Sequence, residues 1–260
     1  LSLPSVGATE NAMLAACGAE GTTVIANAAR EPEIVDLQTF LQKMGAHVQG
    51  AGSSTVVVEG GAPLHGCVHT VVADRIVAAT YLAAAAGPGG DIRLEGVDYR
   101  HLSAVATMLR QAGCRLTCGE TSIRLQARRL QSAGPIRTAP YPGFPTDAQA
   151  VLMASLLRSE GATVFVENIF DSRYRHVPEM VRMGADIRLE GRVAVVCGVD
   201  RLHGAAVRAR ELRGGASLVL AGLQAEGETA VTGVEHIQRG YEDLTGELAQ
   251  LGADIRQEER

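Results

Sequence analysis

One segment recurs four times along the 260-residue chain at a spacing of about 70 residues, and this repetition constrains the fold more than any other feature. Each copy reads as the end of a helix, followed by a glycine and the start of a strand. Glycine directly after a helix supplies the left-handed backbone conformation that a residue with a Cβ resists. The four glycines are Gly45, Gly113, Gly184 and Gly252. The pattern therefore predicts a chain built from repeated supersecondary units.

The repeated unit is predicted to be an α/β element of the form βαβαββ. Each copy also has an earlier helix that closes on a glycine turn before a strand, and the alternating residues after the second helix, as in 186–198, are typical of two short paired strands. Two helices with one apolar stripe each cannot bury those stripes within one short unit, so the units must pack on each other. A period this long favours a closed, symmetric arrangement with helices inside and sheets outside.

Composition argues against nucleic acid and membrane partners. The apolar content of 46% is enough for a packed core, the net charge is only −5, and no run of four basic residues occurs. The longest apolar tract, residues 76–86, is too short to cross about 30 Å of hydrocarbon. Its small residues instead predict a buried helix that packs closely against its neighbours.

The five cysteines are odd in number and scattered, which fits a reducing cytoplasm. Cys114 and Cys118 are separated by three residues, but no second pair with zinc spacing accompanies them. We therefore predict no metal site and no cofactor. The chain begins at Leu1 rather than at Met, in what reads as the middle of an element, so we expect a partial sequence that lacks an N-terminal part.

Three motifs carry candidate functional groups, and each has a structural alternative. In PSVGATENAML, Ser5, Gly7 and Thr9 precede a helix and suit either a phosphate or ordinary helix capping. In PYPGFPTDAQA, Asp147 follows Thr146 at a helix entrance. It is either a first-turn charge or an acid/base residue supported by a rigid loop with three prolines.

The third motif group consists of arginines near helix starts. Arg173 and Arg175 precede one helix, and Arg213 and Arg239 sit at two inferred helix entrances. Isolated arginines are usually solvated, but a cation at a helix entrance is repelled by the dipole, which favours an anion lying between them. The charge-rich segment 30–37 is interpreted as a structural helix start, with Pro32 in the first turn.

Six motifs together resemble the UDP-N-acetylglucosamine enolpyruvyl transferase family: PSVGAT, AREPEIVDL, PGFPTDAQA, SRYRHVPEMVRMGA, LRGGASLVLAG and HIQRGYEDL, spread from Ser5 to Arg256. The resemblance implies an inside-out α/β barrel of six βαβαββ units in two domains, of which four are expected here. Residues 1–72 would be the last unit of the first domain, and residues 73–260 the three units of the second.

The resemblance also implies roles for individual residues. Asp147 matches the carboxylate that takes the proton from the sugar 3-hydroxyl. Arg213 and Arg239 match arginines that hold phosphoenolpyruvate, and Arg173 matches an arginine near the reacting centre. Contacts with UDP-N-acetylglucosamine are implied for Pro4, Ser5, Val6, Gly7, Thr146, Asp147 and Ile169.

The implied function is transfer of the enolpyruvyl group from phosphoenolpyruvate to UDP-N-acetylglucosamine, the first committed step of peptidoglycan synthesis, in the bacterial cytoplasm. The family's general acid, a cysteine or occasionally an aspartate on a mobile loop, matches none of the cysteines here, so we expect this chain alone to be inactive. Two alternatives stay open: a non-catalytic sugar-nucleotide-binding homologue and an enolpyruvylshikimate phosphate synthase-like transferase.

Overall fold

The computed structural model describes residues 1–258, which divide into two compact units. Of the described residues, the N-terminal unit comprises 1–73 together with 140–143, and the C-terminal unit comprises 74–139 and 144–258. Each unit has a hydrophobic core of its own.

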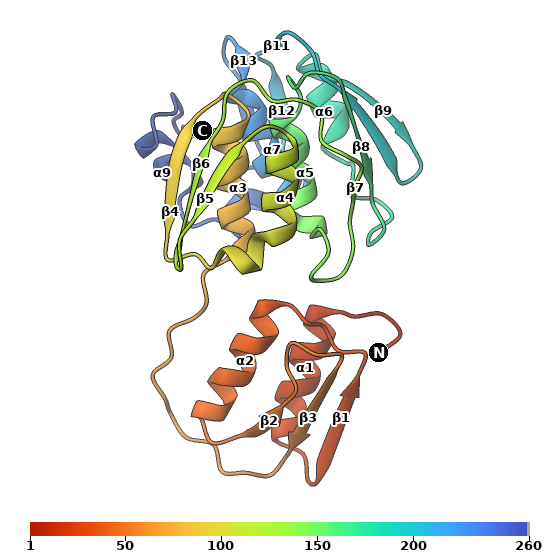
Figure 1. The fold of residues 1–260 in the computed structure, drawn as a ribbon, viewed down its shortest axis with the longest axis vertical. Helices are drawn as coiled ribbons and strands as arrows, with labels where there is room; N and C mark the ends of the chain where they lie inside the picture. Colours follow the sequence, from red (N-terminus) through yellow and green to blue (C-terminus); the bar gives the residue numbers. More distant parts are fainter. Residues whose placement is uncertain (259–260) are drawn as a thin grey trace. The chain divides into compact units, whose positions relative to one another are not determined.

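The N-terminal unit is a three-stranded antiparallel sheet with two helices (Figure 1). Strand β3 lies between the other two and buries Val56 and Val58, so one face of the sheet packs against the helices and forms the core. The elements in chain order are α1 Val6–Cys17, β1 Thr22–Ala26, α2 Pro32–Lys43, β2 His47–Gln49 and β3 Thr55–Glu59. Pro32 opens α2, as the sequence predicted.

The C-terminal unit begins with a second sheet of the same strand order, β4-β6-β5. The third sheet, β7-β8-β10-β9, has β7 added parallel to β8. The elements are α3 Arg75–Ala86, β4 Asp91–Glu95, the short 3₁₀ helix η1 Tyr99–Leu102, α4 Ser103–Gln111, β5 Arg115–Cys118, β6 Ser122–Gln126, β7 Ile136–Arg137, α5 Thr146–Ser155, β8 Ala162–Val166, α6 Val177–Arg182, β9 Asp186–Glu190 and β10 Val193–Cys197.

The rest of this unit has short parallel strand pairs, β11 with β13 and β12 with β14. Its elements are β11 Leu202–His203, β12 Ala206–Arg208, α7 Leu212–Gly222, β13 Ala225–Glu226, β14 Ala230–Thr232, α8 Glu235–Gln238 and α9 Leu244–Gln250. A strand was expected directly after Gly252, but residues 253–258 form none. A strand requires a hydrogen-bonded partner, and none pairs with this stretch within the described residues.

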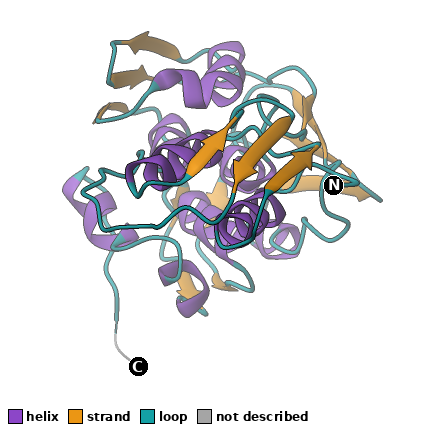
Figure 2. Ribbon diagram, turned by 90° about the horizontal axis from the view of Figure 1, so that it is seen from below, coloured by secondary structure: helices purple, strands orange, loops and turns teal. Residues whose placement is uncertain are grey.

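Three helices form the centre of the C-terminal unit. Helices α3, α5 and α7 pack on one another, and the strands of this unit lie outside them (Figure 1). Figure 2 distinguishes helices from strands by colour in a second view. Their residues are mostly buried, and alanines and glycines allow the helix axes to come close. The expected inner placement of the helices is therefore found within this unit. No helix in the described part of the chain combines the length and apolar content needed to span a bilayer.

The four repeated glycines share one backbone conformation. Their φ angles are +99° at Gly45, +96° at Gly113, +94° at Gly184 and +98° at Gly252, and each follows the end of a helix. These positive φ angles confirm the predicted left-handed helix ends. The left-handed region is strained for residues with a Cβ, which explains why glycine stands at all four positions.

Candidate active site

Asp147 occupies the first turn of α5 and remains accessible. Pro145, the N-cap residue of α5, lies two positions before Asp147 and has extended backbone (φ −71°, ψ 133°), while the Asp147 side chain is 43% exposed. Asp74, the matching residue of the preceding repeat, is instead the N-cap of α3 and accepts hydrogen bonds from the N–H groups of Ile76 and Val77. Asp147 does not cap α5, so its carboxylate is available for other partners.

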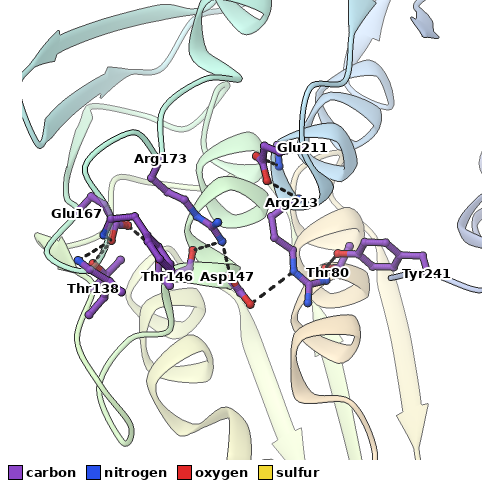
Figure 3. Close-up of polar contacts among 12 residues, drawn as sticks. Thr80, Thr138, Thr146, Asp147, Glu167, Arg173, Glu211, Arg213 and Tyr241 are labelled. Carbon is purple, nitrogen blue, oxygen red and sulfur yellow. Dashed lines mark hydrogen bonds and ion pairs between the residues drawn. The ribbon is translucent and has the colours of Figure 1, made fainter. Parts of the chain in front are cut away.

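Two arginines contact the Asp147 carboxylate, one at each oxygen (Figure 3). Arg173 donates from Nη2 to Oδ1, and the same Nη2 lies 3.4 Å from the backbone carbonyl of Thr146. Nε of Arg213 lies 3.8 Å from Oδ2. Arg173 and Arg213 are only 16% and 11% exposed, so the ion pairs are partly shielded from water.

Arg213 lies in the first turn of α7, as the sequence predicted. The side chain of Glu211 caps this helix by accepting from the backbone N–H groups of Arg213 and Gly214. The guanidinium carbon of Arg213 lies 5.4 Å from the centre of the Tyr241 ring. The hydroxyl of Tyr241 is in turn 2.8 Å from the buried hydroxyl of Thr80 on α3, which fixes the ring.

The arginines retain unused donors. Nε and Nη1 of Arg213 and Nε of Arg173 are buried, and within the described residues none of them makes a hydrogen bond. Buried charged donors without a partner are costly, and so they mark a place for an acceptor. Two guanidiniums facing one carboxylate leave a net positive charge, which makes this site suited to an anion.

Arg239 does not fit the sequence-based expectation of a helix entrance. It follows the last residue of α8, Gln238, and is exposed. A cation at the C-terminal end of a helix is favoured by the dipole, so the argument for an anion beside Arg239 no longer holds. Within the described residues, Arg239 makes no hydrogen bond or ion pair with Asp147, Arg173 or Arg213.

Ile169 lies in the turn that follows β8, and its backbone N–H already makes a hydrogen bond. The N–H of Ile169 donates to Oε1 of Glu167 at 2.8 Å, while its side chain is 38% exposed. A ligand contact through the Ile169 backbone can therefore use only the carbonyl oxygen. Glu167 itself was missed by the sequence analysis, although strict alternation along β8 places it on the buried face with Thr163 and Phe165.

His176, which precedes α6, is also buried close to the site. Neither ring nitrogen makes a hydrogen bond of normal geometry with a described residue. Burial and then the positive charge of Arg173 lower the pKa of His176 to about 3, and the backbone of Arg173 opposes this only weakly. The imidazole is therefore neutral at physiological pH.

The PSVG segment lies in the N-terminal unit. Ser5 is the N-cap of α1, and its hydroxyl accepts from the N–H of Ala8 at 3.3 Å, which supports the capping alternative. Thr9 is buried and accepts from the N–H of Ala29 at 3.0 Å, so its hydroxyl is not free for a phosphate, contrary to one expectation. Pro4 and Val6 are partly buried, whereas Gly7 is exposed with open space where a Cβ would be.

The described residues contain no group of three or more His, Cys, Asp or Glu side chains that could hold a metal ion. Burial raises the pKa of the Cys114 thiol to about 11, which disfavours the reactive thiolate form.

Residues 1–248 match the family of EPSP synthase (3-phosphoshikimate 1-carboxyvinyltransferase). The chain belongs to this family of enolpyruvyl transferases. Among curated proteins, it is 52% identical to UDP-N-acetylglucosamine 1-carboxyvinyltransferase 2 of Caldanaerobacter subterraneus subsp. tengcongensis, over 98% of the chain and 61% of that protein. It is also 52% identical to UDP-N-acetylglucosamine 1-carboxyvinyltransferase of Zymomonas mobilis, over 96% of the chain and 59% of that protein.

Solved structures of the family agree in fold. The enolpyruvyl transferase NikO from Streptomyces tendae superposes with a TM-score of 0.87 at 29% identity, covering 96% of this chain and 60% of its own. EPSP synthase from Acinetobacter baumannii gives a TM-score of 0.74 at 22% identity, covering all of this chain and 63% of its own. The chain thus spans about 60% of the length of the relatives that it matches.

Proposed function

We propose that the protein containing this chain transfers the enolpyruvyl group from phosphoenolpyruvate to the 3-hydroxyl of UDP-N-acetylglucosamine and releases phosphate. The observation that carries the proposal is the Asp147 carboxylate held between Arg173 and Arg213. High identity to enzymes named for this reaction supports the choice of acceptor.

The site residues divide the chemistry between them. The 3-hydroxyl oxygen adds to C2 of phosphoenolpyruvate, its proton passes to Asp147, and C3 of phosphoenolpyruvate is protonated. The tetrahedral adduct then loses phosphate and a C3 proton to give the enol ether. Arg173 and Arg213 neutralise the anionic substrate with donors already in place, which favours the transition state.

Further contacts are proposed from the resemblance. Arg239 would be a third phosphoenolpyruvate ligand, and its exposure leaves it free to meet a substrate. Contacts with UDP-N-acetylglucosamine are likewise proposed for Thr146, for the carbonyl of Ile169, and for Pro4, Ser5, Val6 and Gly7. The general acid would come from a part of the protein outside this chain, so that the chain alone would be inactive.

The division of the chain into repeats and domains is also proposed from the resemblance. We assign residues 1–72 to the last βαβαββ unit of a first domain and residues 73–260 to three units of a second, within an inside-out α/β barrel. The exposure of an apolar residue on helix α1, Leu14 at 51%, supports this assignment, because further units of the first domain would cover it. A role in peptidoglycan synthesis in the cytoplasm follows from the proposed acceptor.

Phosphate release by the protein from the complete reading frame tests the proposal. With phosphoenolpyruvate present, UDP-N-acetylglucosamine should support turnover and 3-phosphoshikimate should not. The opposite preference would assign the protein to the EPSP synthase reaction. Binding of UDP-N-acetylglucosamine without phosphate release would instead identify a non-catalytic homologue.

A further inference from the structure

One buried carboxylate joins the segments that carry the proposed site. Glu167 follows β8 and is 1% exposed. Its Oε1 accepts hydrogen bonds from the hydroxyl of Thr138 at 2.9 Å and from the N–H groups of Ile169 at 2.8 Å and Phe170 at 3.0 Å. Its Oε2 accepts from the hydroxyl of Thr146 at 3.0 Å. Figure 3 shows this carboxylate facing Thr138 and Thr146.

Each of the four groups that hydrogen-bond to this carboxylate is a donor. An ionised carboxylate is an acceptor only, and four hydrogen bonds offset much of the free energy lost when its charge leaves water. The surroundings of Glu167 are thus matched to its charged form, and hydrogen bonds to a charge are stronger than those between neutral groups. Such a cluster holds its members in one arrangement.

Two of the four donor residues also lie next to the Asp147–Arg173 ion pair. Thr146 immediately precedes Asp147, and the ring of Phe170 lies 5.4 Å from the guanidinium carbon of Arg173. Both members of the Asp147–Arg173 pair are therefore held relative to the same buried side chain.

The anchor on the other side of Glu167 is rigid as well. The N–H of Thr138 donates to the carbonyl of Val166 at 3.0 Å, and the Thr138 hydroxyl accepts from the N–H of Asn168 at 2.8 Å. The side chain of Asn168 donates back to the carbonyl of Thr138 at 3.0 Å. These contacts tie Glu167 to the third sheet.

From this arrangement we infer that Glu167 is a positioning residue: it fixes the separation of Asp147 and Arg173 and thereby aligns the acceptor hydroxyl with phosphoenolpyruvate. The inference rests on the proposed function. Glu167 is buried and does not touch substrate, so it acts only through its neighbours. A displacement of about 1 Å at reacting groups can lower the rate by about 100-fold.

A purely structural role for Glu167 predicts lost stability with no specific loss of rate. Two buried threonines separate these cases. Thr138 and Thr163 are both 0% exposed, and the hydroxyl of each accepts from a backbone N–H, from Asn168 at 2.8 Å and from Ala133 at 3.1 Å respectively. Only Thr138 also donates to Glu167.

The test compares Thr138→Val with Thr163→Val in the protein from the complete reading frame. Thr138→Val should lower kcat by about 10-fold or more, with KM for both substrates changed by less than about threefold, because alignment and not binding is lost. Thr163→Val should keep kcat within about twofold at a similar loss of thermal stability.

Glu167→Gln provides a second variant if Thr138→Val fails to fold. It should lower kcat, and its effect combined with Thr138→Val should be smaller than the product of the single effects, because both act through one cluster. With an active wild-type protein, equal kcat values for the two threonine variants would overturn the inference. So would effects of Glu167→Gln and Thr138→Val on kcat that simply multiply in the double variant. No phosphate release by the wild-type protein would remove the proposed function, and this inference with it.

Discussion

The Nε of Arg213 lies 3.8 Å from Oδ2 of Asp147, and this contact joins the first turns of α7 and α5. The positive ends of two helix dipoles thus meet where two arginines face a single carboxylate. The excess of positive charge, together with buried donors that lack hydrogen bonds, explains why the site suits a multiply charged anion.

Replacement of Arg213 should weaken phosphoenolpyruvate binding. Arg213→Lys keeps the charge but loses the planar set of donors, of which Nε and Nη1 are buried. Loss of charge-assisted hydrogen bonds of about 1.5–3 kcal/mol should raise KM for phosphoenolpyruvate by roughly 10- to 100-fold. Arg201→Lys is the control, since that side chain is 75% exposed. Similar KM values for both variants would argue against Arg213 as a ligand.

The left-handed glycines should differ in their tolerance of a methyl group. Gly113→Ala places a side chain at φ +96° with its nearest neighbour, Cγ of Gln131, 3.9 Å away, so only the backbone strain of about 1–2 kcal/mol is expected. Gly233→Ala, at φ +77°, places its Cβ against the backbone carbonyl oxygen of Ala209, which cannot move aside. Urea unfolding should therefore show the larger destabilisation for Gly233→Ala. An unchanged Gly113→Ala variant would contradict the backbone argument.

Stability should depend on pH through His176. Its folded pKa of about 3 lies below the unfolded value of about 6.5, so the unfolded chain takes up the proton first as pH falls. The contribution of His176 is thus complete above about pH 6.5 and is lost progressively toward pH 3, by at most about 1.4 kcal/mol per pH unit.

Unfolding measured from pH 7 to pH 4 checks this dependence. His176→Phe should lose less stability over the range than the wild-type protein, whereas the exposed His203→Gln should follow the wild type. Parallel curves for His176→Phe and wild type would show that His176 is not held neutral.

The helices and their glycine ends could be predicted because periodicity and backbone sterics act locally. Residues 76–86 lie in α3, and Asp147 and Arg213 stand in the first turns of α5 and α7. The prediction that Arg239 stands at a helix entrance was wrong. Helix α8 has only four residues, which are too few for an apolar period to mark its ends.

The contacts of Asp147 with Arg173 and Arg213 could not be predicted from the spacing of these residues along the sequence. It depends on how α5 packs on α7 and on the turn that carries Arg173. Glu167 could have been found, because its place in the alternation of β8 predicts a buried carboxylate, and such a group needs several donors.

The most direct test of the account is kcat for phosphate release by Asp147→Asn in the protein from the complete reading frame. Asparagine preserves the shape of the side chain but cannot take the proton from the 3-hydroxyl, so kcat should fall by about 100- to 10,000-fold. Asp200→Asn, at a side chain that is 95% exposed, should leave kcat unchanged. An Asp147→Asn protein that retains kcat within about threefold of the wild type would contradict the role of Asp147 as the base.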